Sequence, residues 1–494
     1  MEKYHESDSI VKDKELLDDI LNSVISDDEV RIQLNRLKSG KASGSDGIAI
    51  EFLKCARDYI VPCLTSLFNV ILTSGEYPSS WAEGIINPIH KSGSKDDPDH
   101  YRKITVMVAV GKVFEAVLLN RLEFKNEALN HDDTYQFGFK KNCRTTDNLF
   151  LLQSIIEKQK FKKQPLYVCF VDFTKAFDYV NRQALFYKLL KRGVQGNFCQ
   201  VLMNLFQKAT CMIRWHGQLS EQIQSLFGVL QGGMISPKLF SEYLTNLGDY
   251  LNETCGIIID DIFLYYILYA DDLVLCSDTP EGLQMQIDGL LEFCKKWHMI
   301  INLTKTKILV FNKKNDTHKF YFNSVEIDRS TSYKYLGVWL NTDKFDYFKQ
   351  THEYLINQAQ KAMFQATRLS SPVVGKLSPP LAFKVFDSQI LPILEYGAEI
   401  WSKGKSIDIM ETFQLKFLKN VLWVRPQTPT DAIYAETGRL PLVIRHKFKV
   451  ARYKSPEILA KKCFLIFVRM SILCICHIKI TFMPKLQNRE KWGI

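Results

Sequence analysis

The chain has 494 residues, which allows roughly three structural units. Apolar residues make up 46% of it, charged residues 24% and aromatic residues 12%, and this composition excludes a wholly disordered or collagen-like protein. Lys and Arg outnumber Asp and Glu by 64 to 54, a mild excess that permits a nucleic-acid or acidic partner without requiring one.

The first elements that the sequence predicts are helices. Residues 1–30 are polar with few aromatic side chains, so we expect a flexible lead. Apolar residues over 30–37 repeat at helical spacing, and Gly40 is typical of a helix end. A Gly- and Ser-rich loop that begins at Lys41 then leads into an apolar helix over 52–72.

Strands and helices alternate in the middle of the chain. Short strands are predicted from Ile85 and over 104–110, on either side of a polar loop, which favours a mixed α/β domain. Residues 166–173 are apolar on both faces, as is typical of a buried strand. Two acids separate the apolar arms of 267–276, which predicts a hairpin, and the helix over 281–298 carries an apolar stripe that we assign to the core.

The last third of the sequence is rich in predicted helix. Prolines interrupt it beyond about residue 341, where we place a domain boundary. Residues 463–482 are apolar enough to suggest a membrane span, but basic residues interrupt them, so we favour a buried helix or strand pair, or a tail separated from its packing partner, and expect no membrane partner. The Cys-x-Cys-His cluster at 474–477 matches no usual metal-site spacing.

The cysteines and the start of the chain bear on its location. Twelve cysteines occur singly and irregularly, which favours a reducing compartment. The first residues are acidic and polar, whereas a signal peptide has a basic and then an apolar run. We therefore expect an intracellular protein.

Three acids are the candidate catalytic residues. Asp172 ends the buried strand, and Asp271 and Asp272 lie at the tip of the predicted hairpin, so they converge if these strands are neighbours in one sheet. Buried carboxylates without compensation are costly, and two Mg²⁺ ions would neutralise such a cluster and bind a triphosphate. The alternative is that each acid only caps a loop, which the joint context of both segments disfavours.

Further segments along the chain carry motifs that belong together. In chain order they are KASGSDGIAIEFLK, PIHKSGSKDDPDHYRKIT, YQFGFKKNCRTTDNLF, FVDFTKAFDYV, GVLQGGMISPKLF, YADD, INLTKTKILVF and YKYLGVWL. In this order, over about 30–340, they resemble the reverse transcriptase of LINE-type non-LTR retrotransposons. A thinner likeness extends to LPILEYGAEIW at 391–401.

The resemblance implies an α/β (α+β) fold of the right-hand polymerase type. It divides the chain into a flexible lead over 1–30, fingers over 31–165, a palm over 166–340, a helical thumb or connection over 341–430 and a tail over 431–494, which we take as truncated. The implied activity is that of an RNA-directed DNA polymerase, which extends a DNA primer on an RNA template with deoxynucleoside triphosphates. The cofactor would be two Mg²⁺ ions, with Mn²⁺ as an alternative, and the family suggests the nucleus and cytoplasm as locations.

The resemblance also assigns roles to single residues. Asp172, Asp271 and Asp272 would be the catalytic acids and would bind metal together with Phe173. The residues that would contact the incoming nucleotide are Lys91, Arg102, Phe177 (as a steric gate against a ribose 2′-OH), Gln231, Gly232 and Lys305. The residues that would contact primer or template are Lys41, Arg144, Tyr269, Tyr335, Leu336 and Gly337. Asp178 is as compatible with structural capping as with a role in its motif.

The sequence departs from the family in two respects. The fingers motif usually runs Tyr-Arg-Pro-Ile-Ser, whereas 101–105 reads YRKIT, so that Lys103 replaces a rigid proline. We also expect no upstream endonuclease and no zinc knuckle in this chain, which suggests a truncated or mis-joined copy. The alternative function is therefore a catalytically degenerate remnant that still binds nucleic acid. An RNA-dependent RNA polymerase is disfavoured because bulky Phe177 would exclude the 2′-OH.

Overall fold

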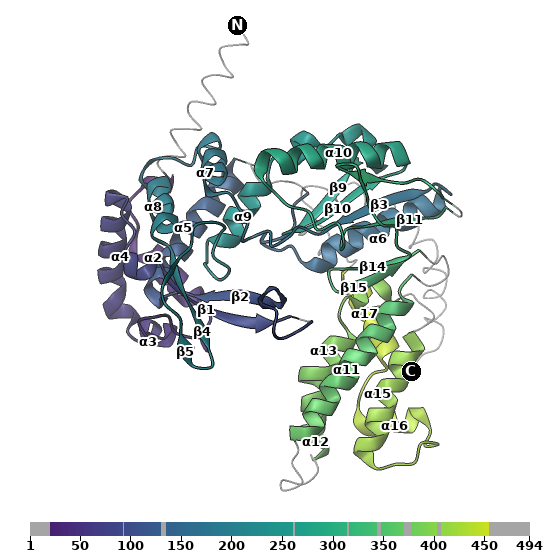
Figure 1. Cartoon of the computed structure of the whole chain (residues 1–494). Coiled ribbons are helices and arrows are strands. Elements are labelled where there is room, and N and C mark those ends of the chain that lie inside the picture. Colours follow the sequence, from purple (N-terminus) through teal and green to yellow (C-terminus); the bar gives the residue numbers. More distant parts are fainter. Residues whose placement is uncertain are drawn as a thin grey trace, which may run out of the picture. The chain divides into compact units, whose positions relative to one another are not determined.

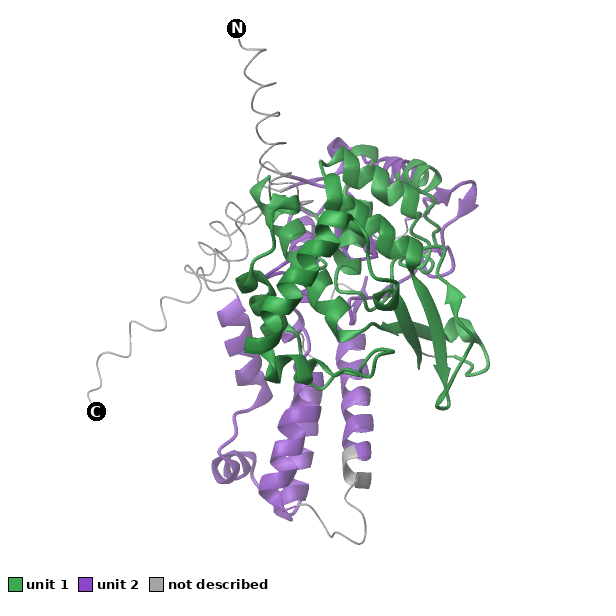
Figure 2. Cartoon of the chain, turned by 90° about the vertical axis from the view of Figure 1, so that its left-hand side faces the viewer, with its two compact units in different colours: residues 1–139, 173–250, 290–301 green, residues 140–172, 251–289, 302–494 purple. Residues whose placement is uncertain are grey.

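The computed structural model describes residues 20–91, 93–129, 135–259, 262–313, 316–342, 347–369, 378–402 and 407–453. The chain forms two compact units, shown in Figure 2. Unit 1 comprises 1–139, 173–250 and 290–301, and unit 2 comprises 140–172, 251–289 and 302–494. Both units are discontinuous in sequence, so the contiguous fingers, palm and thumb ranges do not coincide with them and stay a prediction. The apolar tail over 463–482, with its Cys-x-Cys-His cluster, lies outside the described residues.

Unit 2 contains a four-stranded antiparallel sheet (Figure 1). Its strands are β3 (Leu166–Val171), β9 (Tyr266–Tyr269), β10 (Asp272–Ser277) and β11 (Lys307–Phe311), in the order β11-β3-β10-β9. Every residue of β3 is buried, because neighbouring strands pair with both of its edges and side chains cover both of its faces. The predicted buried strand and hairpin are thereby confirmed.

Short hairpins and helices complete unit 2. The hairpins pair β7 (Ile257–Ile259) with β8 (Ile262–Leu264), β12 (Tyr321–Phe322) with β13 (Val325–Glu326), and β14 (Ser332–Tyr335) with β15 (Val338–Asn341). The helices are α6 (Thr145–Phe161), the first part of α10 (Pro280–Trp297), α11 (Lys349–Leu369), α12 (Pro379–Val385), η5 (Phe386–Ile390), α13 (Leu391–Leu394), α14 (Ala398–Trp401), α15 (Ile407–Leu422), α16 (Thr430–Thr437) and α17 (Leu442–Tyr453). In the part of the chain that the structure describes, every element after β15 is helical, as predicted.

A second sheet and a set of helices form unit 1. Its strands are β1 (Glu83–His90), β2 (Tyr101–Val106), β4 (Thr210–Trp215), β5 (Gln218–Leu219) and β6 (Ile223–Gln224), in the order β2-β1-β4-β5 with β6 beside β4. Its helices are α2 (Asp27–Arg36), α3 (Ile50–Cys55), α4 (Arg57–Ser74), α5 (Ala109–Ala128), α7 (Arg182–Lys191), α8 (Gly196–Lys208), α9 (Ser236–Leu244) and the last part of α10. The strand predicted over 104–110 ends at Val106, because Ala109 already begins α5 and the apolar run reads alike in both elements.

Order begins earlier than the predicted flexible lead over 1–30 allows. Ser26 and Glu29 form a capping box at the start of α2, which adds a helical turn before the predicted 30–37. The buried guanidinium of Arg121 on α5 forms an ion pair with Glu29 and donates hydrogen bonds to the carbonyl oxygens of residues 21, 23 and 24. These contacts from α5 order residues 21–24, for which the polar composition of the sequence alone does not predict a defined structure.

A buried carboxylate holds one end of the unit 2 sheet. The side chain of Asp316 is 1% exposed, and its oxygens lie 2.7 Å from Tyr167 Oη, 2.8 Å from Lys313 Nζ and 3.1 Å from Arg329 Nη1. Burial raises the pKa of Asp316, but the hydrogen bonds from Lys313 and Tyr167 outweigh burial and hold the pKa well below its usual range. The cluster ties the start of β3 to the segment that follows β11.

We predict that Asp316→Asn lowers the free energy of unfolding by about 1–3 kcal/mol, because it leaves two cations without their buried counter-charge. A carboxylate with a depressed pKa contributes stability only above its unfolded pKa, so the parent should also lose stability as the pH falls below about 4. Denaturant unfolding at neutral and acidic pH measures both effects. Asp328→Asn is the control, because the Asp328 pair with Lys307 has a 2.7 Å contact but Asp328 is 72% exposed. Equal losses in the two variants would contradict the prediction.

Candidate functional site

The three candidate catalytic acids come together at one end of the unit 2 sheet. Leu273 of β10 pairs with Val171 of β3, so the register places Asp272 opposite Asp172, which directly follows β3. Ala270 and Asp271 form the two-residue connection between β9 and β10. The structure therefore brings together the acids that the sequence places on separate segments.

The connection between β9 and β10 has an unusual backbone. Ala270 has a φ of 58°, and two-residue hairpin loops normally place glycine, asparagine or aspartate at positive φ. An alanine there costs of the order of 1 kcal/mol. Asp272 pairs with Tyr269 in the hairpin, so the local register fixes where the two acids project. Strain that persists beside candidate catalytic groups is common at functional sites.

The electrostatics of these acids favour a cation. Burial, and then the charges of Asp271 and Asp172, raise the pKa of Asp272 to about 7. Lys305 Nζ lies 3.9 Å from Asp172 Oδ2, on a side chain that is 68% exposed. The segment that carries Lys305 is fixed to Asp172, because the Asp172 N–H donates to Thr306 Oγ1 and the Asp172 carbonyl oxygen accepts from the Asn302 N–H.

The same acids are the donors that a divalent metal would use. Among the described residues, no three His, Cys, Asp or Glu side chains lie close enough together to hold a metal ion as they stand. Carboxylate oxygens are nevertheless the ligands that Mg²⁺ prefers, and a divalent cation would relieve the repulsion that raises the Asp272 pKa. The acids fit Mg²⁺ if their side chains rotate toward it. Phe173 has a buried side chain, so only its backbone carbonyl is suited to its predicted role.

The predicted phosphate contacts of unit 1 lie on and beside the β1–β2 hairpin. Lys91 follows β1, and its N–H donates to the carbonyl oxygen of His100. Arg102 is exposed and pairs with Ile89, whereas its neighbour Lys103 projects from the other face of β2, since successive side chains of a strand alternate. Lys103 Nζ lies 3.3 Å from Asp178 Oδ2, a contact that sequence reasoning missed.

The Gln231-Gly232 loop packs against β2. The Thr105 N–H donates to the Gln231 carbonyl oxygen at 2.6 Å. Gly232 has a φ of 130°, and a Cβ atom there would lie 2.1 Å from the Thr105 carbonyl oxygen, so this position requires glycine. Phe177 is half-buried and stacks on Phe240 with ring centroids 4.4 Å apart, which fixes the orientation of the predicted steric gate.

A buried acid that sequence reasoning missed supports the same loop. Glu115 on α5 accepts hydrogen bonds from the N–H groups of Met234 and Ile235, at 2.8 and 3.4 Å, where α9 begins. Burial raises the pKa of Glu115. The signal in the sequence was a lone acid within the apolar stripe VFEAV.

The predicted primer hairpin, β14 and β15, has a tight turn that a tyrosine supports. Leu336 and Gly337 have φ values of 45° and 84°, which matches a type I′ turn. Tyr396 Oη donates to the Leu336 carbonyl oxygen at 2.8 Å, and a Cβ atom on Gly337 would lie 2.9 Å from the Tyr396 ring. Tyr335 is buried and its hydroxyl accepts from Asn148 Nδ2 at 3.3 Å, so its side chain supports the hairpin and is not available to a primer.

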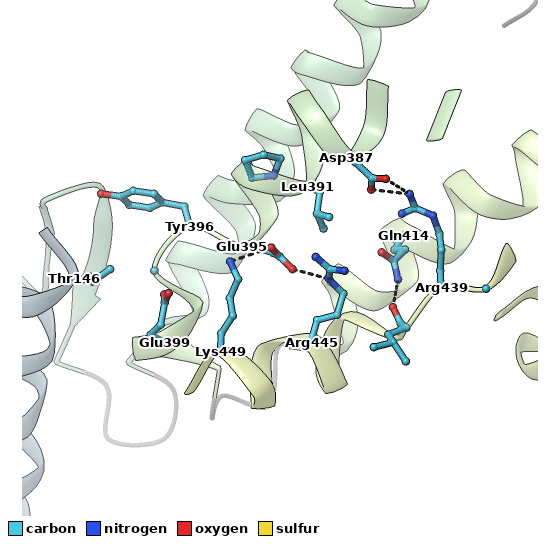
Figure 3. Close-up of a pocket in the computed structure, with 14 residues that line it drawn as sticks. Thr146, Asp387, Leu391, Glu395, Tyr396, Glu399, Gln414, Arg439, Arg445 and Lys449 are labelled. Atoms are coloured by element: carbon cyan, nitrogen blue, oxygen red, sulfur yellow. Dashed lines mark hydrogen bonds and ion pairs between the residues drawn. The ribbon is translucent and has the colours of Figure 1, made fainter. Parts of the chain in front are cut away.

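Ion pairs fix the segment that carries Tyr396. Figure 3 shows Tyr396 near one end of a cavity of about 810 Å³ within unit 2. The neighbouring Glu395 is buried and accepts from Arg445 Nε at 2.8 Å and from Lys449 Nζ at 2.9 Å (Figure 3). Burial raises the pKa of Glu395, but these two cations outweigh burial and lower it. The helical part of unit 2 thereby holds the hairpin turn.

The remaining predicted contacts are spread over both units. Lys41 is exposed in unit 1, on the loop before α3. Arg144 is exposed in unit 2, where it caps α6 through its N–H and Asp147 Oδ2, 2.7 Å apart. Tyr269 ends β9 beside the acids, and burial together with the neighbouring Tyr396 raises its pKa. These placements do not by themselves assign a nucleic-acid contact.

Comparisons with known proteins agree with one another. The family described as "Reverse transcriptase (RNA-dependent DNA polymerase)" matches residues 89–340. The chain is 25% identical over 417 residues to the RNA-directed DNA polymerase from mobile element jockey of Drosophila melanogaster, covering 81% of this chain and 44% of that protein. It is 26% identical to the probable RNA-directed DNA polymerase from transposon X-element of the same species, covering 76% of this chain and 41% of that protein. The chain thus spans less than half the length of these two relatives.

Further similarities extend the comparison. The Pol polyprotein of the type-1 retrotransposable element R2 of Nasonia vitripennis is 27% identical, covering 64% of this chain and 31% of that protein. A solved structure of apo telomerase from Candida tropicalis, truncated from the C-terminal domain, matches 56% of this chain and 59% of that chain at 15% identity. Its TM-score of 0.37 is too low for this likeness to bear on the fold.

Within the described ranges, no helix is long and apolar enough to cross a membrane.

We predict that, without divalent ions, the protein loses stability as the pH rises from about 4 through 7. A carboxyl group with a raised pKa is protonated in the folded state, and ionising Asp272 there costs free energy. Asp272→Asn should therefore increase the free energy of unfolding at pH 8 by about 1–3 kcal/mol and flatten this pH dependence. Chemical denaturation in a chelator measures this, with Asp278→Asn, just beyond β10, as control. Added Mg²⁺ should stabilise the parent more than the variant; an unchanged pH profile in Asp272→Asn would contradict the prediction.

Proposed function

The chain belongs to the reverse transcriptase (RNA-dependent DNA polymerase) family, and from this premise we propose that it is the RNA-directed DNA polymerase of a non-LTR retrotransposon. Its reaction would be two-metal nucleotidyl transfer, which extends a DNA primer on an RNA template. The observation that carries the proposal is the register of β3 and β10, which sets Asp172 opposite Asp272 next to the turn with Asp271. Phosphoryl transfer with two divalent ions uses carboxylate oxygens as metal ligands, and these acids would supply them once their side chains turn toward the ions.

The residues of unit 2 would divide the work of the reaction. Bound Mg²⁺, or Mn²⁺, would supply Lewis-acid activation of the primer 3′-OH and charge neutralisation on the phosphates. Asp172 and Asp271 would be the principal metal ligands, and Asp272, with its raised pKa, would steer geometry more than bind. Lys305, 3.9 Å from Asp172, carries the positive charge suited to the leaving pyrophosphate.

The remaining proposed contacts with nucleotide, primer and template are assigned from the sequence motifs that carry the residues. Lys91, Arg102, Phe177, Gln231 and Gly232 are proposed to contact the deoxynucleoside triphosphate. Lys41, Arg144, Tyr269 and the β14–β15 turn are proposed to contact primer or template, with backbone groups serving at Tyr335. The division into fingers, palm and thumb is proposed for the same reason, as is an intracellular location.

The first test is incorporation of labelled deoxynucleotide on an RNA template with a DNA primer and Mg²⁺. We predict synthesis by the parent and a loss of at least about 10³-fold in the Asp271→Asn, Asp272→Asn double variant, because it removes two metal-binding charges. Primer–template binding should persist in the variant. If neither protein incorporates nucleotide while both bind primer and template, the chain is a degenerate binding remnant and the proposed activity is wrong.

Sugar selection tests the role of Phe177 separately. We predict that Phe177→Val lowers the KM for ribonucleotides by roughly tenfold or more and changes the KM for deoxynucleotides little, because the smaller side chain leaves room for a 2′-OH. Steady-state kinetics with both nucleotide types measures this. Phe139→Val is the control, because Phe139 contacts the Phe177 ring edge, with ring centroids 6.1 Å apart, but carries no predicted role. Unchanged sugar discrimination in Phe177→Val would remove the gate role.

A further inference from the structure

Lys103 stands where the family motif usually has proline, and the structure shows what the lysine does there. Its Nζ lies 3.3 Å from Asp178 Oδ2. Asp178 belongs to the segment that follows the first catalytic acid, so the ion pair joins the β1–β2 hairpin to that segment within unit 1. Where the family motif usually has a rigid proline, this chain thus has a lysine that forms an ion pair with Asp178.

The other oxygen of Asp178 holds Gln231. Gln231 Nε2 donates to Asp178 Oδ1 at 3.0 Å, so the carboxylate lies between the lysine and the glutamine. The Gln231 backbone is held as well, because its carbonyl oxygen accepts from Thr105, which lies two residues after Lys103 on the same strand. Strand β2 therefore holds Gln231 in two ways: the Thr105 N–H binds its backbone directly, and the Lys103 side chain reaches its amide through Asp178.

The charge of Asp178 decides how the Gln231 amide points. The Asp178 side chain is 25% exposed and that of Lys103 is 54% exposed. An ionised carboxylate only accepts hydrogen bonds, so it selects the NH₂ end of the amide and turns the carbonyl end away. Lys103 keeps the partly buried carboxylate neutralised. Losing either charge would leave the amide free to rotate.

We propose that Lys103 and Asp178 are positioning residues that orient the Gln231 side chain and thereby set the affinity for the incoming nucleotide. This inference rests on the proposed polymerase function. It also assigns Asp178, for which the sequence left capping and motif roles equally open, to the support of the nucleotide loop. Lys103 compensates for the missing proline by an ion pair instead of by backbone stiffness.

The test compares single and paired charge changes. We expect Asp178→Ala and Lys103→Glu each to raise the KM for deoxynucleotide by roughly three- to tenfold, with smaller changes in kcat and in primer–template affinity, because one or two hydrogen bonds are lost. The double variant Lys103→Glu, Asp178→Lys restores the ion pair in reverse, but its lysine selects the oxygen end of the Gln231 amide and so reverses the orientation of the amide. We therefore expect the double variant to recover stability while its KM for deoxynucleotide stays raised. An effect that came only from lost stability would be rescued together with the ion pair.

The chain offers a matched control pair. Lys175 Nζ lies 2.7 Å from Asp99 Oδ1, and this ion pair joins the same two segments, although Asp99 is 66% exposed and Asp178 is 25% exposed. No hydrogen bond or ion pair in the described part of the chain joins it to Gln231. We expect Asp99→Asn to leave the KM for deoxynucleotide unchanged. An equal rise in Asp99→Asn, or a KM that returns to the parent value in the swapped pair, would overturn the proposal.

A readout that does not depend on catalysis separates this inference from the proposed function. Amide hydrogen exchange over residues 229–235 should quicken in Asp178→Ala and return toward the parent rate in the swapped pair, whether or not the protein incorporates nucleotide. If the parent proves inactive but exchange responds in this way, the proposed function fails and the positioning of Gln231 stands. If exchange over these residues is unaffected, the positioning role is wrong.

Discussion

The pairing of β10 with β3 brings the carboxylates of Asp172 and Asp272 to the same end of a buried sheet, where their negative charges repel each other. Residues 273–276 of β10 are apolar and buried on both faces, so burial does not select one register; the two-residue turn at Ala270 and Asp271 fixes the pairing with β9 and thereby the position of the acids. The positive φ of Ala270, the anchored Lys305 segment and the raised pKa of Asp272 all lie next to this pairing.

Within each unit, charged side chains hold the loops and turns that carry residues of the candidate site. Asp178 orients a glutamine, Glu115 holds the start of α9, and Glu395 fixes the segment whose tyrosine supports the Leu336 turn. Each of these acids has a basic or N–H partner, whereas Asp272 mainly meets other acids. This contrast distinguishes acids that support the fold from Asp272, whose neighbouring charges favour a cation.

The sequence predicted the elements that have strong local patterns. The buried strand before Asp172, the hairpin around Asp271 and the helical character beyond residue 341 follow from apolar periodicity, which is a local property. Sequence reasoning missed Lys103 and Glu115, because each acts through a partner that is distant in the chain, and it left order at residues 20–29 unassigned because Arg121 supplies it from α5. Tyr335 matched its motif, yet its side chain is buried, since a motif records residue type and not side-chain direction.

The discontinuity of the two units has a consequence for synthesis on the ribosome. Residues 290–301 complete unit 1, and unit 2 gains its last segments only after them, so an emerging chain holds partial versions of both units for most of translation. Early segments such as β3 must wait for β11, more than a hundred residues later, before both edges are paired. Neither unit can therefore complete its fold early in translation. Until β11 emerges, the unpaired edge of β3 is a site where chaperones can bind or where other chains can pair and aggregate.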